Sequence, residues 1–253
     1  MHSKMILVLS ISAMALSGVV HANPTIMDIN PVWVKPEQAF IPSGFDDNDN
    51  AQIVLDGWYS NTCYKSAPTE VTVDEAQKVI SIKNKAYFND AAMCVAMMVR
   101  FTDVIDLGLM RAGQYRVMVG EKQNGKFAPM GTLRIASRQR LAAQGKSLSD
   151  EVLYAPVQDV FIQLSRKEGA DPVLVLRGVM TSSCMEVKEV LLRYTEGNVV
   201  EVRPIAQIKG DGFCIQKMIP FEKRVSLKDA PQGRTLIHVR SLNGKAINKV
   251  VDL

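Results

Sequence analysis

Histidine is the residue type that most limits the chemistry open to this chain of 253 residues, because it occurs only three times. His2 and His21 lie among the first 22 residues, and His238 lies near the C-terminus. A catalytic triad or a histidine metal site in the rest of the chain would have to use His238. This residue falls on the outward side of an alternating stretch, where we expect a solvated surface side chain. The sequence therefore predicts no catalytic, metal-binding or cofactor-binding residue and no enzyme.

The acidic stretch from Asp46 to Asn50 is the part of the sequence that most resembles a cation site, because Ca²⁺ prefers several oxygen ligands. Counted from Asp46 or from Asp47, the stretch lacks the glycine at position six and the glutamate at position twelve of the helix-loop calcium motif. We expect a hydrophilic turn between strands, and calcium binding by Asp46–Asn50 stays an open alternative.

Cysteine is the remaining candidate for chemistry, and its four positions are Cys63, Cys94, Cys184 and Cys214. The first cysteine ends the stretch VLDGWYSNTC and the third ends VLRGVMTSSC, so Val-Leu-x-Gly precedes both at the same distance. Further along, residues 79–119 align without a gap with residues 199–239, and the second cysteine then matches the fourth. Because the matches fall on cysteines, glycines and apolar positions, we interpret the chain as a tandem duplication.

A duplication predicts one disulfide within each copy, Cys63–Cys94 and Cys184–Cys214. An even number of cysteines in an exported chain favours disulfides. A zinc site made of four cysteines would need close pairs such as C-x-x-C, which this sequence lacks. The cysteines are therefore expected to stabilise the fold and not to carry chemistry.

Methionine is abundant, with 13 residues, and Met93, Met97 and Met98 lie beside the second cysteine. Thioether sulfurs are ligands for copper(I). The second copy has Phe213 and Lys217 at the first two of these positions, so a shared copper site is not indicated. We expect the methionines to fill a core or to form one adaptable apolar contact face.

Short alternating or β-branched stretches recur about every 8–15 residues in both copies and are separated by turn formers, which is typical of strands. In the second copy Ile237 and Val239 face inward, while His238 faces outward. Asn-Gly pairs at 124–125 and 243–244 supply the positive φ angles of tight hairpin turns. Each copy is therefore predicted to end in a β-hairpin.

The number of short strands and the disulfide in each copy predict an all-β fold with two tandem immunoglobulin-like β-sandwich domains. The Gly-x-Tyr sequence at Tyr115 resembles the tyrosine corner of immunoglobulin-like domains, over one strand. Thr235 takes the place of this tyrosine in the second copy. Gly57 and Gly178, which precede the first cysteine of each copy, are expected to mark the points where strands end and bend toward the disulfides.

Residues 1–22 have the short positive start, apolar stretch and Val-His-Ala cleavage site of a secretory signal peptide. The two domains are predicted at 23–136 and 153–253, joined by a polar linker at 137–152. Residues 23–45 contain four prolines and are expected to supply an edge strand and a lead-in. The protein is therefore predicted to be periplasmic or secreted.

The formal net charge of +4 is too small and too interspersed for a nucleic-acid-binding surface. After the signal peptide, no segment is long and apolar enough to span a membrane. The predicted partner is therefore neither nucleic acid nor the membrane interior, and no cofactor is implied.

Binding is expected in the loops of the two sandwiches, because loops on a rigid scaffold usually carry it. The candidate binding residues lie beside the cysteines, at Ser60, Asn61, Thr62, Tyr87, Phe88, Thr181, Ser182, Ser183 and Lys209. The predicted function is an exported, non-catalytic binding or structural module whose partner is another envelope or extracellular protein.

Two alternatives to this function stay open. One is a periplasmic chaperone-like protein with two immunoglobulin-like domains, similar in outline to pilus chaperones, which lend an edge strand to a client. The other is a hydrolase or redox enzyme with an unrecognised site.

Overall fold

The computed structural model describes the chain in six stretches, which are residues 31–90, 93–121, 126–146, 152–164, 171–210 and 213–253. Nearly all of the regular structure is β-strand, which confirms the predicted all-β fold. The predicted signal peptide and the Asn-Gly pair at 124–125 lie outside the described residues.

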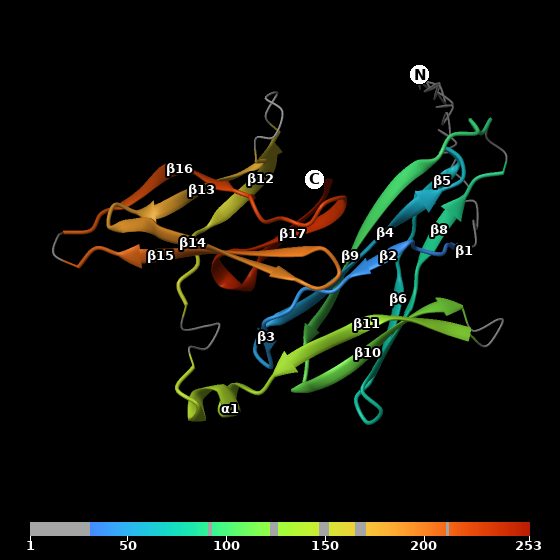
Figure 1. Ribbon diagram of the computed structural model, residues 1–253, viewed down its shortest axis with the longest axis horizontal. Helices are drawn as coiled ribbons and strands as arrows, with labels where there is room; N and C mark the ends of the chain where they lie inside the picture. The colour runs from blue at the N-terminus through green and yellow to red at the C-terminus, as the bar shows by residue number, and fades with distance from the viewer. Residues whose placement is uncertain (1–30, 91–92, 122–125, 147–151, 165–170, 211–212) are drawn as a thin grey trace, which may run out of the picture.

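The N-terminal sandwich packs two sheets against each other around one core (Figure 1). One sheet has the strand order β2-β4-β9 and the other has the order β3-β11-β10-β7-β6. A small sheet of order β1-β8-β5 extends the second one, because β8 continues β7 after one residue. The strands are β1 Val32–Trp33, β2 Gln38–Phe40, β3 Phe45–Asp46, β4 Asn50–Tyr59, β5 Tyr64–Ser66, β6 Glu70–Asp74, β7 Val79–Lys83, β8 Lys85–Phe88, β9 Val99–Leu109, β10 Gly113–Glu121 and β11 Lys126–Ala136.

The C-terminal sandwich likewise packs a sheet of order β12-β13-β16 against a sheet of order β14-β15-β17-β18. Its strands are β12 Val157–Gln163, β13 Val173–Ser182, β14 Met185–Thr195, β15 Val199–Ile208, β16 Gln216–Ser226, β17 Arg234–Arg240 and β18 Ala246–Asp252. A 3-10 turn at Leu242–Gly244 joins the last two strands, and both Asn243 and Gly244 have positive φ. This sandwich therefore ends in the hairpin that its Asn-Gly pair predicts.

The two sandwiches share their strand connectivity, which supports the interpretation of a duplication. In the first, β7 leaves a hairpin with β6 and runs parallel to β10. In the second, β15 leaves a hairpin with β14 and runs parallel to β17. Parallel pairs are the minority in β-sheets, so a shared parallel pair at the same place is a specific similarity.

Each core is made of the inward side chains of two facing sheets, as expected for a sandwich. Leu55 and Val117 belong to the N-terminal core. Leu176 and Val239 belong to the C-terminal core. All four side chains are completely buried, and Val239 confirms the inward side predicted for β17.

The tyrosine-corner contact is present in both sandwiches. The hydroxyl of Tyr115 lies 2.9 Å from the carbonyl oxygen of Arg111, four residues upstream. The hydroxyl of Thr235 lies 3.2 Å from the carbonyl oxygen of Pro231, which is the equivalent position. The smaller residue of the second copy therefore keeps the contact at the entry to the strand.

Gly57 and Gly178 lie inside β4 and β13, so the expectation that they mark strand ends is wrong. A β-carbon on Gly57 would lie 2.8 Å from the ring of Phe101 on the neighbouring strand. A β-carbon on Gly178 would lie 2.7 Å from the ring of Phe221 and 2.1 Å from the carbonyl oxygen of Pro156. Glycine is needed here because another chain segment comes too close for any side chain.

The two sandwiches contact each other through the outer faces of unlike sheets, β2-β4-β9 of the first and β14-β15-β17-β18 of the second (Figure 1). The centre of the contact is apolar, where Phe40 and Val54 pack with Val199 and Leu236. All four are completely buried. Apolar burial of this kind stabilises the contact by about 25 cal/mol per Å² removed from water.

An ion-pair cluster closes one end of this interface. The carboxylate of Asp56 is 1% exposed and accepts hydrogen bonds from Arg234 and Arg100, each at 2.8 Å. The Thr102 hydroxyl donates to the same carboxylate at 3.0 Å. Burial alone would raise the pKa of Asp56, but the hydrogen bonds from the two arginines outweigh it and lower that pKa. The carboxylate is therefore charged and fully partnered.

His238 lies in the same interface and is completely buried, so the prediction of a solvated side chain is wrong. It does point away from its own core, as the alternation indicates, but the first sandwich covers it. Its Nδ1 lies 2.7 Å from Oδ1 of Asn248. The Asn248 amide in turn donates to Oε1 of Gln52 at 2.7 Å.

The segments around the sandwiches include the predicted edge strand. The proline-rich lead-in supplies β1, β2 and β3, each at the edge of its sheet. Between the sandwiches lies α1, Arg138–Ala143, whose N-cap Ser137 accepts a hydrogen bond from the Arg140 amide. In Figure 1 this helix lies beside the end of β11.

Candidate interaction surfaces at the two disulfide-linked tips

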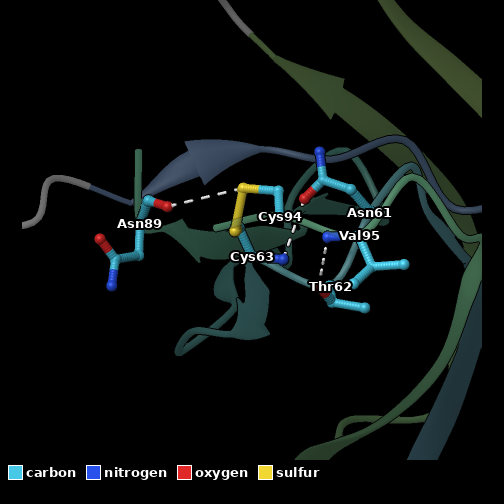
Figure 2. Close-up of a disulfide and its surroundings, with 6 residues drawn as sticks. All are labelled: Asn61, Thr62, Cys63, Asn89, Cys94 and Val95. Atoms are coloured by element: carbon cyan, nitrogen blue, oxygen red, sulfur yellow. Dashed lines mark hydrogen bonds between the residues drawn. A yellow bond between two sulfur atoms is a disulfide. The ribbon is translucent and has the colours of Figure 1, made fainter. Parts of the chain in front are cut away.

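Both predicted disulfides are present, one at the end of each sandwich. Cys63 and Cys94 join the end of β4 to the segment that precedes β9, with α-carbons 5.3 Å apart (Figure 2). Cys184 and Cys214 make the equivalent link between the end of β13 and the segment before β16, at 5.4 Å. We call these two ends of the molecule tip 1, residues 59–66, 87–90 and 93–99, and tip 2, residues 180–187, 207–210 and 213–219.

In tip 1, polar side chains beside the disulfide hold the two linked segments together. The Cys63 amide donates to Oδ1 of Asn61 at 2.9 Å. The Val95 amide donates to the Thr62 hydroxyl at 3.0 Å (Figure 2). The Thr62 amide donates to the Val95 carbonyl at 3.3 Å. Asn61 and Thr62, two of the predicted binding residues, therefore have a structural role.

Tip 2 repeats this arrangement with different residues. The Cys184 amide donates to the Ser182 hydroxyl at 3.3 Å, as the first cysteine does to Asn61. The Ile215 amide donates to the Ser183 hydroxyl at 3.1 Å, and the Ser183 amide donates to the Ile215 carbonyl at 3.0 Å. The two tips are therefore built alike at the level of individual hydrogen bonds.

A small cluster of packed apolar side chains adjoins the disulfide-linked segments of each tip. In tip 1 the ring of Tyr59 stacks on Phe101 and Tyr64, and Tyr64 contacts Phe88, with ring centroids 4.7–5.5 Å apart. In tip 2 the equivalent cluster is aliphatic and sulfur-containing, apart from one phenylalanine, and includes Met180, Met185, Ile219 and Phe221. Phe88, a predicted binding residue, is therefore partly used in packing.

Three equivalent positions near the second cysteine of each copy carry exposed apolar side chains. Relative to the second cysteine of each copy they are one residue before it, one after it and four after it. Met93 is 97% exposed and its counterpart Phe213 is 93% exposed. The other exposed pairs are Val95 with Ile215 and Met98 with Met218. We call these six side chains the tip residues, and their shared exposure is not explained by packing within the chain.

The remaining predicted binding residues lie on the same two tips. Ser60 and Thr181 are exposed at the ends of β4 and β13, and Tyr87 is exposed on β8. Lys209 forms an ion pair with Glu186 at 2.7 Å. Hydrogen bonds from Lys209 and then Gln207 lower the pKa of that glutamate.

The residues that sequence reasoning missed are the exposed apolar ones. Met93, Met97 and Met98 were expected in a core or in an apolar contact face, and all three are exposed. A comparison of apolar character between the copies, instead of methionine identity, would have found the pairs Met93 with Phe213 and Met98 with Met218.

The acidic stretch Asp46–Asn50 forms a turn held by its own hydrogen bonds. The Asn48 amide donates to Oδ1 of Asp46 at 2.9 Å, and the Asp46 amide donates to Oδ2 of Asp49 at 2.8 Å. The Arg138 amide donates to Oδ1 of Asp47 at 3.0 Å. Within the described stretches, no three histidine, cysteine, aspartate or glutamate side chains are grouped to hold a metal ion.

Comparison with known proteins bears on the N-terminal sandwich. Residues 53–128 match the model of a family described as the ORF11 beta-sandwich domain. The match runs from β4 into β11, so it includes tip 1 and agrees with the sandwich architecture seen here. No curated protein matches the chain, and no solved structure matches it.

The described part of the chain contains no helix that is long and apolar enough to cross a membrane.

Proposed function

We propose that the protein is exported and acts as a non-catalytic module that binds another protein of the cell envelope or the extracellular space through its two tips. One observation carries this proposal. The same three positions on both disulfide-linked tips expose apolar side chains, among them Met93 and Phe213. Clustered exposed apolar side chains usually mark an interaction site, because water otherwise disfavours them.

The construction of the tips supports a docking role. A disulfide, a reciprocal pair of hydrogen bonds through Thr62 or Ser183 and a small apolar cluster link the two segments of each tip. Because a rigid surface loses little conformational entropy on binding, such a tip suits partner recognition. Methionine at Met93 and Met98 adds an adaptable apolar surface.

Export is supported by two independent features. Disulfides persist in oxidising compartments, and this chain has one in each sandwich. Residues 1–22 have the composition of a secretory signal. N-terminal sequencing of protein isolated from the cell envelope is expected to begin at Asn23. Protein that begins at Met1 and stays with the cytosol would contradict export.

The absence of a catalytic role is part of the proposal and rests on His238. Its Nδ1 is engaged by the amide of Asn248, which is not a nucleophile. Burial of the ring lowers the pKa of His238 to about 4, so it is a weak base. A histidine in this setting is poorly suited to general base catalysis near neutral pH.

Site-specific photo-crosslinking tests the docking role. A photo-reactive phenylalanine analogue replaces Met93 in one variant and Phe213 in another, and Leu109 serves as the matched control. Leu109 is 69% exposed and lies at the opposite end of β9 from tip 1. Irradiation of intact cells is expected to give a protein adduct of defined mass at one or both tips and none at Leu109.

Two outcomes would contradict the docking role. One is the absence of any adduct at both tips, and the other is equal labelling at all three positions. An adduct found only with a probe on the edge strand β12 would instead favour the chaperone-like alternative, since such chaperones act through an edge strand.

A further inference from the structure

A cleft at the joint between the two sandwiches lies well away from both tips. It consists of two adjoining pockets of about 310 and 540 Å³. They share Gly44, Phe45 and Arg193, together with Leu141 of α1. The walls therefore come from the first sandwich, the second sandwich and the linker helix, three parts that only the folded chain brings together.

The cleft is lined by six cations and two carboxylates. The cations are Arg134, Arg140, Lys146, Arg193, Arg203 and Arg240, and the carboxylates are Asp46 and Glu201. The 540 Å³ pocket has three of the arginines and no acidic residue. The lining is thus strongly positive in a protein whose overall charge is mild.

Two of the cations already have acidic partners. Arg193 pairs with Glu201 at 2.9 Å, and the Ser43 amide donates to the same carboxylate at 2.6 Å. Arg240 pairs with Asp49 at 3.3 Å and donates to the Gly44 carbonyl at 2.6 Å. These contacts hold both guanidinium groups in place at the wall of the cleft.

Three other arginines have no acceptor among the described residues. Arg134 and Arg140 line the larger pocket, and Arg203 lines the smaller one. Arg203 is half-buried on the outward side of β15, two residues after Glu201. Arg134 and Arg140 are exposed, so water solvates these guanidinium groups, and an anion that displaces the water gains charge-assisted hydrogen bonds.

We propose that this cleft binds a small phosphate-bearing anion. Arg193, Arg203, Arg240 and Lys146 converge on one pocket of about 310 Å³. A phosphate group offers three or more acceptor oxygens and up to two negative charges, which suits several guanidinium forks better than the two oxygens of a carboxylate. The ligand brings the acceptor that Arg203 lacks.

A neighbouring pocket of about 490 Å³ has room for the uncharged part of such a ligand. It shares Phe45, Tyr154 and Arg240 with the basic pocket. It is also lined by the polar residues Asn48 and Asn243, and by Asp49, which pairs with Arg240; asparagine amides suit hydroxyl-bearing ligands. The cleft therefore suits a phosphate ester better than inorganic phosphate alone.

Isothermal titration calorimetry on the whole protein tests this site, with glycerol phosphate and inorganic pyrophosphate as probes. Saturable binding of one equivalent is expected at physiological ionic strength. Arg203→Gln and Lys146→Gln, which change two cations of the 310 Å³ pocket, are each expected to raise Kd about tenfold, the effect of one charge-assisted hydrogen bond. Arg203→Lys keeps the charge and is expected to recover part of the affinity. Arg116→Gln is the matched control, because Arg116 is an exposed arginine on β10 outside the cleft.

Two results would overturn the proposal. One is the absence of saturable heat for either probe up to about 10 mM, near the weak end of specific binding. The other is an equal loss of affinity in Arg116→Gln and Arg203→Gln, which would show nonspecific attraction. A parallel flotation assay with vesicles that contain phosphatidic acid distinguishes a lipid source of the phosphate from a soluble ester. Because the cleft and the tips share no residue, failure of one proposal leaves the other intact.

Discussion

Arg234 and Asp56 meet across 178 residues of sequence, with their guanidinium and carboxylate groups 2.8 Å apart. They belong to different sandwiches, so this ion pair links the N-terminal sandwich to the C-terminal sandwich. Arg100 lies beside them and also bonds to the carboxylate, at 2.8 Å. The pair is therefore the place where the joint between the sandwiches can be tested most directly.

Replacing Asp56 with alanine is expected to lower the free energy of unfolding by about 3 kcal/mol, because it leaves two partly buried arginines without their shared acceptor. Urea denaturation at neutral pH measures the loss. Asp252→Ala is the control, since Asp252 also pairs with Arg234 but is 68% exposed, and its loss is expected to stay below about 1 kcal/mol. Equal losses in the two variants would contradict a special role for Asp56.

Stability is expected to fall as the pH falls from about 6.5 toward 4. Burial lowers the pKa of His238 from 6.5 to about 4, so in this range the unfolded chain binds a proton that the folded chain does not. The favourable contribution of the neutral ring is complete above the unfolded pKa and decreases by about 3 kcal/mol as the pH approaches 4. Arg240, Glu201 and Asp49 face the same ring, and their charges are secondary to burial.

The measurement for His238 is urea denaturation at several pH values for the wild type and for His238→Gln. The variant has no proton to gain, so its stability is expected to depend less on pH between 4 and 6.5. Parallel curves for the two proteins would show that His238 does not cause the pH dependence.

Removing either disulfide is expected to destabilise the protein to a similar extent. The linked cysteines are 31 and 30 residues apart, and loops of this length correspond to roughly 3.5 kcal/mol in the chain-entropy estimate. The double variants Cys63→Ser/Cys94→Ser and Cys184→Ser/Cys214→Ser, compared by thermal denaturation, test this. A loss confined to one pair would show that the two tips differ in their dependence on the cross-link.

A second substitution is expected to restore stability after Gly57 is replaced with alanine, but not after Gly178 is replaced with alanine. Gly57→Ala places a methyl group 2.8 Å from the Phe101 ring and 3.1 Å from the Glu37 amide nitrogen, so the second change Phe101→Leu removes the closer contact and is expected to recover part of the stability. Gly178→Ala also meets the backbone oxygen of Pro156 at 2.1 Å, which cannot move aside as a side chain can. Phe221→Leu is therefore expected not to rescue it, and thermal denaturation of the four variants separates the two cases.

The sequence predicts the elements well because strands and disulfides follow local rules. The duplication pairs Cys63 with Cys94 without any knowledge of the fold, and the alternation in β17 places Val239 in the core and His238 on the other side. The alternation of apolar and polar residues along a strand does not indicate what covers the outer face of its sheet. A face that water covers and a face that another sandwich covers with Phe45 and Gln52 both show the same alternation in sequence.

The candidate surfaces are likewise predictable from the sequence only in part. The positions of the tips follow from the cysteines, so Asn61 and Thr62 are correctly placed beside the disulfide. Their use in hydrogen bonds between segments depends on the distance between two loops, which sequence spacing does not give. The cleft is the hardest feature to predict from the sequence, because Arg140 and Arg203 come to line its two adjoining pockets only after both sandwiches and the linker have packed.

The contact between unlike sheets also has a consequence for assembly. A head-to-tail contact between similar units does not close on itself, so the free sheet at each end of the pair is in principle open to another unit, as in a growing fibre. At these free faces Arg177 occupies the position of Asp56, and Gln114 occupies the position of Arg234. The ion pair that joins the two existing units therefore has no counterpart at either end. A further copy stacked on either free face would lack this ion pair.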